Sequence, residues 1–170
     1  FNIPRKLWTV EQQSVAMSER LRQANNNLAT ASRRFEELFE KLPVACFTLG
    51  PGGMVYEWNR ESECAFSMPS AMAFMNPITA LFGDSSDGFW STEAVQSLFD
   101  GEVIADALWT LKLQSGEERH FVASIYPFRD SSDSIMGVIC ANVDITRRVE
   151  AERLAALHLR ELEDANKKLE

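Results

Sequence analysis

Two histidines and three cysteines are the residues of this chain best suited to nucleophilic or metal chemistry. His120 and His158 belong to no recognisable Ser/His/Asp or Cys/His arrangement. Cys46, Cys64 and Cys140 are widely separated and form no CxxC pair. The chain also lacks the glycine-rich loop of the Walker type that cradles nucleotide phosphates. We therefore predict that this chain is not an enzyme.

The acidic segment from Asp84 to Phe89 is the best candidate for a metal site, because it begins like a calcium-binding loop. Such a loop needs a glutamate at its twelfth position, and this segment has none. We interpret it as an ordinary loop and predict no metal site. His120 is interpreted as a solvent-facing strand residue, and His158 as a polar residue of a helix.

The separated cysteines also indicate the compartment in which the protein works. Three cysteines cannot all pair with one another, which favours a reducing, cytoplasmic environment. The longest apolar run, Ile135–Ala141, has seven residues, whereas a membrane span needs about 18. The chain begins at Phe1 without an initiator methionine or a signal peptide, so we expect it to be part of a longer protein that could be anchored elsewhere.

The net charge of −8 is concentrated in the middle of the chain. Residues 43–146 carry four basic and fourteen acidic side chains, whereas residues 1–42 have a net charge of +2 and residues 147–170 are neutral. Such an acidic surface repels phosphate backbones, and no stripe of basic residues interleaved with aromatic residues is present. We therefore expect no direct binding of nucleic acid.

Residues 1–42 are predicted to form a coiled-coil linker helix. Seam residues alternate spacings of three and four from Leu7 to Leu42, with Ser14 as the polar exception. A 3.5-residue period kept over five heptads is typical of a coiled-coil seam rather than of a helix packed on its own domain. Pro43 is expected to end the helix. The seam residues expected to hold a dimer together include Leu21, Leu28, Phe35 and Leu38.

Residues 147–170 are predicted to form a second helix of this kind, because neither glycine nor proline follows Thr146. The motif Leu21-x-x-Ala24-Asn25-x-x-Leu28 of the first helix recurs as Leu162-x-x-Ala165-Asn166-x-x-Leu169. The recurrence favours an array of similar units joined by helices. The alternative is a chance similarity between two helices of simple composition.

Residues 43–146 are predicted to form an α+β domain, with a five-stranded antiparallel sheet and short helices on one face. Gly50-Pro-Gly-Gly53 separates the strands of a hairpin, and Asn59 is placed to cap a short helix that ends at Phe66. Thr92–Phe99 is predicted to form a further helix. The predicted strands are Ala45–Leu49, Met54–Trp58, Asp106–Leu113, Arg119–Phe128 and Met136–Val143.

Short motifs at the edges of these elements add a more specific indication. They are Phe35-x-x-Leu38-Phe39-x-x-Leu42-Pro43, Gly53-x-Val55-x-x-Trp58-Asn59, Trp109-x-Leu111 followed by Ser115-Gly116-Glu117, Ile125-x-Pro127, and Gly137 followed by Asp144-Ile145-Thr146. In this order they resemble the motifs of a PAS domain, the sensory module of bacterial signalling proteins. The resemblance covers about residues 33–150, and the flanking helices are similar to the linkers of that family.

The resemblance implies that the domain core could carry a cofactor. Flavin-binding light sensors of the family present a reactive cysteine in an Asn-Cys-Arg motif, and residues 70–95 contain no cysteine. Haem-binding members usually supply a histidine from the helix before the third strand, and Thr92–Phe99 has none. We therefore expect neither covalent flavin photochemistry nor haem. Non-covalent flavin ranks first if a cofactor is bound, although no residue requires one.

Strand phase and the resemblance place eight residues around a possible pocket for a small apolar or aromatic ligand. Trp90, expected in a flexible loop, is the candidate for a lid or a stacking surface. The alternative is that these side chains simply fill the core. The eight residues are Cys46, Trp58, Phe89, Trp90, Phe99, Trp109, Phe121 and Tyr126.

The resemblance implies a sensory or dimerising module of a bacterial multidomain protein. We expect a homodimer formed through the flanking helices, and a signal passed through the outgoing helix to a histidine kinase or a diguanylate cyclase. Asp144, Ile145, Thr146 and Arg147 are the expected coupling residues, with Asp144 bonded to an arginine or a neighbouring strand and Thr146 capping the helix. The alternative function is a ligand-free structural spacer in an array of such domains.

Overall fold

The computed structural model describes residues 5–169, which divide into two compact units between Phe39 and Glu40. The predicted N-terminal helix is present as α1 (Arg5–Lys41), while residues 1–4 of that prediction lie outside the described residues. The helix stops two residues before Pro43, because proline disfavours helical geometry in the residue that precedes it. Almost all of its side chains are exposed.

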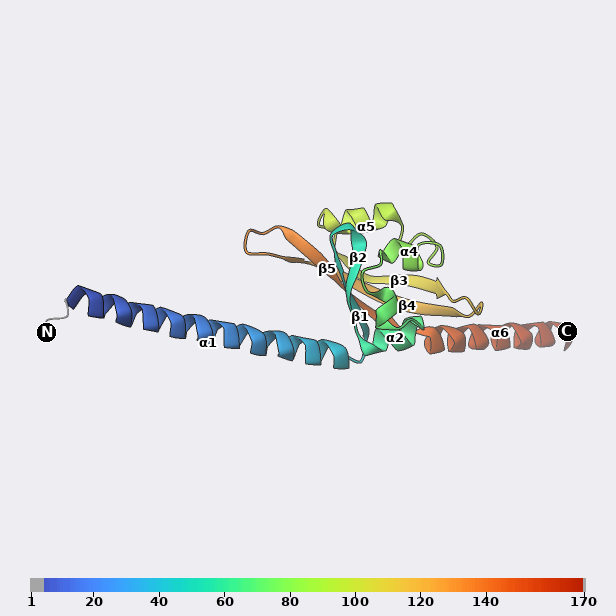
Figure 1. Cartoon of the computed structure of the whole chain (residues 1–170). Helices are drawn as coiled ribbons and strands as arrows, with labels where there is room; N and C mark the ends of the chain where they lie inside the picture. The colour runs from blue at the N-terminus through green and yellow to red at the C-terminus, as the bar shows by residue number, and fades with distance from the viewer. Residues whose placement is uncertain (1–4, 170) are drawn as a thin grey trace. The chain divides into compact units, whose positions relative to one another are not determined.

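The second unit contains the five-stranded antiparallel sheet that the sequence predicted, with strand order β2-β1-β5-β4-β3 (Figure 1). The short helix η1 (Pro51–Gly53) joins the first two strands, and Gly52 within it has a φ of 76° that favours glycine. The bounds of the strands are β1 (Ala45–Gly50), β2 (Met54–Trp58), β3 (Ile104–Lys112), β4 (Glu118–Arg129) and β5 (Ile135–Asp144).

Four short helices cover one face of this sheet (Figure 1). Residues of these helices, among them Phe66, Phe82 and Leu98, join the core residues of the strands in one buried cluster. The helices follow β2 and precede β3, which are the two edge strands of the sheet. The segment that contains them therefore runs across the core face from one edge of the sheet to the other. Their bounds are α2 (Arg60–Phe66), α3 (Ser70–Ala73), α4 (Ile78–Phe82) and α5 (Thr92–Phe99).

The opposite face of the sheet carries exposed apolar side chains, including Tyr56, Tyr126 and Phe128. Two aromatic rings lie over glycines: a Cβ at Gly50 would collide with the ring of Tyr56, and one at Gly137 would approach the ring of Phe128 to 2.6 Å. Glycine is therefore needed at both positions for the rings to lie flat on the strands.

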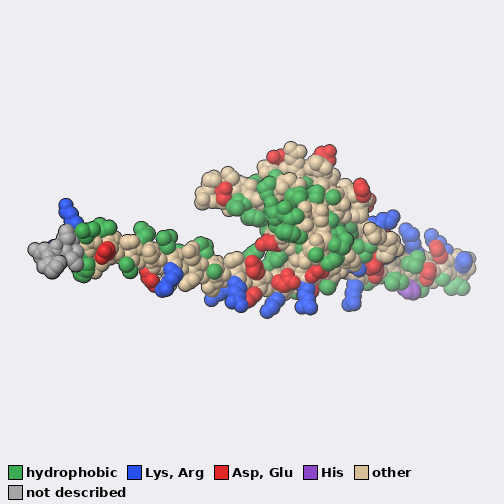
Figure 2. Space-filling view, in the orientation of Figure 1, with side chains coloured by type: hydrophobic (Ala, Val, Ile, Leu, Met, Phe, Trp, Pro, Cys, Tyr) green, Lys and Arg blue, Asp and Glu red, His purple; other side chains and the backbone are tan. Residues whose placement is uncertain are grey.

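The chain leaves the sheet through helix α6 (Thr146–Leu169), which follows β5 after one residue. Most of its hydrophobic side chains are exposed, as are those of α1 apart from the buried Phe39, and Figure 2 shows them along both helices. Within residues 5–169, every helix is too short or too polar to cross a lipid bilayer.

Candidate functional site

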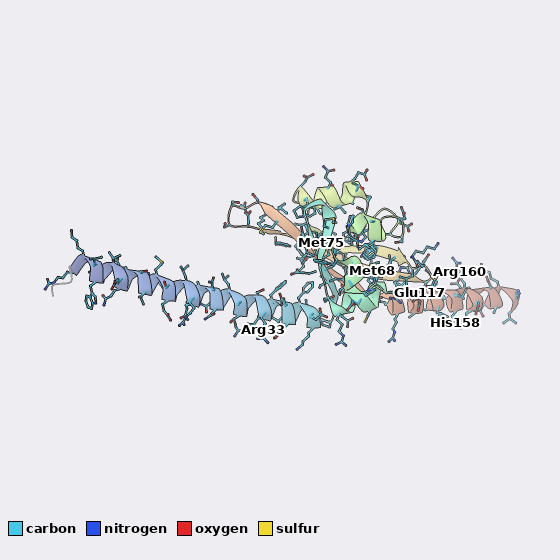
Figure 3. The ribbon with its side chains drawn as sticks, viewed as in Figure 1. Arg33, Met68, Met75, Glu117, His158 and Arg160 are labelled. Carbon is cyan, nitrogen blue, oxygen red and sulfur yellow. The ribbon has the colours of Figure 1, made fainter. Side chains whose placement is uncertain are left out.

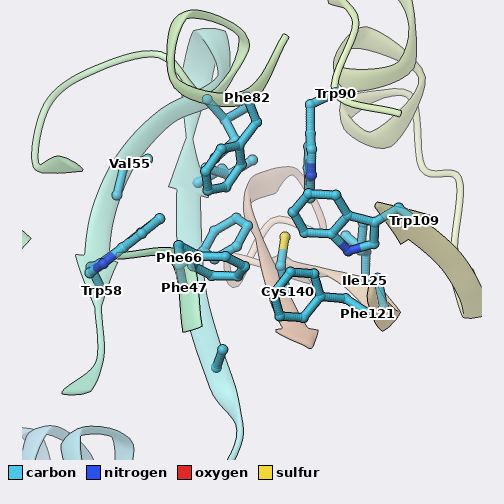
Figure 4. Close-up of a cluster of buried hydrophobic side chains, with 14 of the residues drawn as sticks. Phe47, Val55, Trp58, Phe66, Phe82, Trp90, Trp109, Phe121, Ile125 and Cys140 are labelled. Carbon is cyan, nitrogen blue, oxygen red and sulfur yellow. The ribbon is translucent and has the colours of Figure 1, made fainter. Parts of the chain in front are cut away.

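The predicted pocket region is occupied by a continuous cluster of aromatic rings (Figure 4). Trp109 lies at its centre and stacks on Phe121, with ring centroids 5.0 Å apart, and on Phe89, at 5.5 Å and 10° between planes. Trp90 meets Trp109 edge to face at 5.8 Å. The structure thus brings together five of the predicted pocket residues, namely Trp58, Phe89, Trp90, Trp109 and Phe121.

Two of the other predicted residues lie elsewhere. Tyr126 is 47 % exposed, because it is five residues from Phe121 along one strand and therefore points to the opposite face. Cys46 is buried but lies outside the aromatic cluster, since its neighbour Phe47 points into the cluster. The prediction that Cys46 and Tyr126 line the pocket was wrong, because side chains alternate between the two faces of the sheet along each strand. Phe99 packs partly buried against the edge of the cluster.

Three phenylalanines of the cluster were missed by the sequence argument. Phe47 stacks on Trp58 at 5.2 Å, and Phe66 and Phe82 fill the space between Trp58 and Trp109. Phe47 lies directly opposite Trp58 in the structure, but an irregularity between Thr48 and Leu49 sets this register, so the predicted hairpin did not bring the two rings together. The helices α2 and α4 are too short to show a hydrophobic period, so the sequence contained no signal that Phe66 and Phe82 would be buried in the cluster.

Trp90 does not behave as a loop residue exposed at the mouth of a pocket. It is only 1 % exposed, and its backbone N–H donates to Ser86 Oγ at 3.2 Å. Its indole Nε1 is the one buried side-chain nitrogen or oxygen without a hydrogen-bond partner in the described part of the chain. An unpaired donor in an apolar core carries a desolvation cost of about 1–3 kcal/mol.

The indole nitrogens of the other two core tryptophans have partners. Trp58 Nε1 donates to the carbonyl of Met68 at 3.0 Å. Trp109 Nε1 donates to Asn142 Oδ1 at 2.9 Å, and Asn142 Nδ2 donates to the carbonyl of Ala45 at 3.2 Å. The centre of the aromatic cluster is therefore bonded, through one buried amide on β5, to the first residue of β1.

A second buried amide holds the same segment of β1. Asn59 Oδ1 accepts the backbone N–H groups of Cys46 and Ser62, each at 3.0 Å, and Asn59 Nδ2 donates to the carbonyl of Val44 at 2.9 Å. The predicted capping of α2 by Asn59 is confirmed. The same side chain also fixes residues 44–46, which the local pattern alone could not indicate.

The junction between β5 and α6 is built differently from the prediction. Asp144 Oδ1 accepts the backbone N–H of Thr146 at 2.9 Å and the Thr146 hydroxyl at 2.5 Å, so Asp144 rather than Thr146 caps the helix. Thr146 Oγ1 instead accepts the backbone N–H of His120 at 3.0 Å. Among the described residues Asp144 forms no ion pair with Arg147 or Arg148, and Arg148 pairs with Glu152 instead.

The backbone strengthens this junction. Ile145 donates its N–H to the carbonyl of His120 at 2.8 Å, so His120 is bonded to the junction through both of its main-chain groups. The next residue on β4, Phe121, is fully buried and stacks on Trp109. His120, which is bonded to the start of α6, is therefore the immediate neighbour on β4 of a residue in the aromatic cluster. The side chain of Arg147 lines the cleft beside the junction.

This cleft, of about 520 Å³, lies between the start of β1, helix α2 and the first turn of α6. Arg119 lines it and donates from Nη1 to the carbonyls of Cys64 at 2.8 Å and Ala65 at 2.7 Å. These bonds satisfy carbonyls at the C-terminal end of α2, where a cation is favoured by the helix dipole. Arg119 therefore ties α2 to the strand that also holds the junction.

The histidines and cysteines take no part in a reactive arrangement. His120 is partly buried, and its Nδ1 lies 3.0 Å from Thr110 Oγ1, while His158 is exposed on α6 (Figure 3). All three cysteines are free, and only Cys64 is exposed. Burial raises the pKa of the Cys46 thiol and, together with the charge of nearby Cys46, raises that of Cys140 well above its usual value. Buried thiols of this kind are inert.

With the fold and the junction described, sequence comparison gives the family of this domain. The family described as PAS fold matches residues 39–150, and the chain belongs to it. No curated protein sequence matches the chain.

Solved structures of three domains share the fold. They are the PAS domains of an HTR-like protein from Haloarcula marismortui (18 % identity, TM-score 0.54), of nitrogen regulation protein NR(II) from Vibrio parahaemolyticus (17 %, 0.51) and of BvgS from Bordetella pertussis (20 %, 0.52). The alignments cover 73 %, 65 % and 82 % of this chain and 99 %, 96 % and 98 % of those chains. The chain therefore contains a PAS domain whose fold is similar to that of the PAS domains of these three proteins.

Proposed function

We propose that this domain relays a change in its aromatic core through the β5–α6 junction to an output domain that follows α6. The observation that carries the proposal is the bonding of His120 to the first turn of α6, next to Phe121 in the core. A shift of the rings around Trp109 moves β4, and β4 is bonded directly to Ile145 and Thr146. The domain itself is non-catalytic and cytoplasmic, and the output domain is a histidine kinase or a diguanylate cyclase.

The relay works by a shift between two arrangements of the outgoing helix. Helix α6 has exposed apolar side chains along its length, as does α1, and both pair with a second copy of the chain. A signal that favours one packing of the core then favours one packing of the paired α6 helices, because a displacement of β4 moves the first turn of α6 through the hydrogen bonds of the junction. Asp144 maintains this junction by capping α6.

Replacing Asp144 with alanine tests the junction. We expect the core to stay folded and the first turn of α6 to open, because the variant loses a cap that contributes about 1 kcal/mol. Hydrogen exchange should then become faster at the amides of residues 146–149 and remain unchanged in β1. Asp84→Ala, which removes the same charge from an exposed loop, is the control. Unchanged exchange at residues 146–149 would contradict the role of Asp144.

The core either binds a small ligand or is filled by its own side chains alone, and one observation supports each alternative. The unpaired Trp90 Nε1 supports a small apolar or aromatic ligand with one hydrogen-bond acceptor, whereas the mutual stacking of the rings supports a ligand-free spacer. We favour the ligand, because a buried donor without a partner is rare in native proteins.

Native mass spectrometry of the protein as purified distinguishes the two. We expect a dimer with the mass of a retained small molecule, non-covalent flavin being the first candidate by mass and absorption. A dimer without added mass, still unchanged after incubation with aromatic ligands, would favour the spacer. A monomer would contradict the relay through paired helices.

A further inference from the structure

We propose that two copies of the chain bind a divalent transition metal ion, zinc being the first candidate, between their α6 helices through His158 and Glu161. The inference rests on the proposed dimer and adds a binding site to it, because each copy supplies only half of the ligands. Within residues 5–169 of one chain, no three histidine, cysteine or carboxylate groups lie close enough together to hold a metal ion. The site is therefore incomplete without the second copy.

His158 interrupts the apolar seam of α6. The seam residues alternate spacings of four and three, and all of them except His158 are alanine or leucine. In a coiled coil such positions face the partner helix, and a polar residue there lowers the stability of the pair. The imidazole at this position therefore points to a role other than apolar packing. The seam residues are Ala151, Ala155, His158, Leu162, Ala165 and Leu169.

The proposed dimer brings two such imidazoles together. A relay to output domains that follow α6 in both copies takes the two α6 helices side by side in the same direction, so identical seam residues meet. The two His158 rings then face each other across the seam. The preceding seam residue, Ala155, has a small side chain, which leaves space beside the rings.

Glu161 supplies the second ligand of each copy. It lies three residues after His158, on the same side of the helix, and His158 Nδ1 is 3.8 Å from Glu161 Oε2. Zinc bonds of about 2.0–2.2 Å in a tetrahedral arrangement place two ligand atoms about 3.4 Å apart. The two side chains are 74 % and 65 % exposed, so either can turn to close the difference.

Two copies together complete the coordination. One helix presents one nitrogen and one oxygen at nearly the spacing of zinc ligands. The pair of helices therefore offers two nitrogens and two oxygens, which is the four-ligand tetrahedral set of a structural zinc site. Imidazole and carboxylate are both ligands that zinc accepts.

The charges around the site favour a cation. In the described part of the chain, His158 is the only ion-pair partner of Glu161, so no lysine or arginine neutralises this carboxylate. Arg160, two residues after His158, leaves the helix about 200° around its axis from the imidazole (Figure 3 labels both residues). The nearest arginine in sequence therefore points away from the seam and does not compete with a metal ion.

A metal ion at this position acts on the relay without passing through the aromatic core. His158 lies twelve residues after Thr146, about 18 Å along α6. The ion binds only the arrangement of the two helices in which both imidazoles face each other, so it stabilises that arrangement over others. The dimer thereby has a second input between the junction and the output domain.

Titration with zinc chloride tests the site in the full 170-residue chain after removal of metal with EDTA. A Cys64→Ser background removes the one exposed thiol, which could bind zinc by itself. We expect native mass spectrometry to show one zinc ion per two chains. Sedimentation should show that the dimer dissociation constant falls about tenfold or more with zinc and recovers with EDTA.

Three variants locate the ion. His158→Leu restores an apolar seam, so we expect its dimer to be at least as stable as the parent dimer without metal and not to respond to zinc. Glu161→Gln keeps the size of the side chain but loses its charge, and should bind zinc about tenfold or more weakly. Glu163→Gln is the matched control, because it removes the same charge from an exposed position outside the seam, and it should respond like the parent.

The same measurements separate the possible failures. Dimers that do not respond to zinc would overturn the metal site while leaving the proposed dimer intact. Monomers both with and without zinc would overturn the proposed dimer, and the shared site with it. One zinc ion per chain, or a zinc response that persists in His158→Leu, would place the metal elsewhere and overturn the inference.

Discussion

Replacement of Asn59 with leucine is expected to lower the free energy of unfolding of the PAS domain by about 3–5 kcal/mol. The leucine has similar size but neither accepts nor donates a hydrogen bond. The buried Cys46 N–H and the partly buried Val44 carbonyl would lose their partner, and α2 would lose its cap. Each buried orphan costs about 1–3 kcal/mol, and the cap contributes about 1 kcal/mol.

Urea unfolding followed by tryptophan fluorescence measures this loss. Asn76→Ala is the matched control, because its side chain makes one exposed hydrogen bond to the carbonyl of Met72. We expect the control to lose less than about 1 kcal/mol. Asn59→Asp should fall between the two, since a carboxylate keeps the accepting role but cannot donate to Val44. A loss below about 1 kcal/mol in Asn59→Leu would show that the segment is held without this amide.

The sequence was sufficient where local pattern decides structure. Met54–Trp58 and Thr92–Phe99 have the predicted bounds, because turn residues and a helix cap mark their ends. The capping role of Asn59 was predicted from the same kind of signal. The family could be inferred because its motifs lie at these same element boundaries.

The sequence was insufficient where distant residues meet. Arg119 satisfies carbonyls 54 and 55 residues away, and Thr146 accepts a bond from His120, 26 residues away. Neither contact leaves a spacing that can be recognised. For the same reason the local prediction gave Asp144 an arginine or a neighbouring strand as its partner, whereas its carboxylate accepts from Thr146 at the start of α6.

Replacement of Trp109 with alanine is expected to lower the free energy of unfolding by about 3–5 kcal/mol, the range for large aromatic residues in cores. The variant removes the ring that stacks on Phe89 and Phe121 and leaves Asn142 Oδ1 without its indole donor. Phe99→Ala, at the partly buried edge of the cluster, is the control and should lose less.

Indole should restore much of this stability, because an apolar cavity the size of the lost side chain binds a ligand of the same shape. At a concentration of 100 times its dissociation constant, indole would return about 2.7 kcal/mol. Thermal unfolding of Trp109→Ala with increasing indole measures the effect, and the parent protein should not respond in the same way, because the Trp109 ring already occupies that space.

Indene separates filling of the cavity from the hydrogen bond. It has nearly the shape of indole, with a CH₂ group in place of the N–H, and cannot donate to Asn142, so we expect it to bind roughly tenfold or more weakly. Equal rescue by both ligands would mean that the Trp109–Asn142 bond contributes little, and that the core is linked to Ala45 by packing alone. No rescue of a folded variant would mean that the rings collapse into the gap. A core that closes such a gap by itself would also accommodate a ligand without moving β4, which would contradict the ligand-dependent form of the relay.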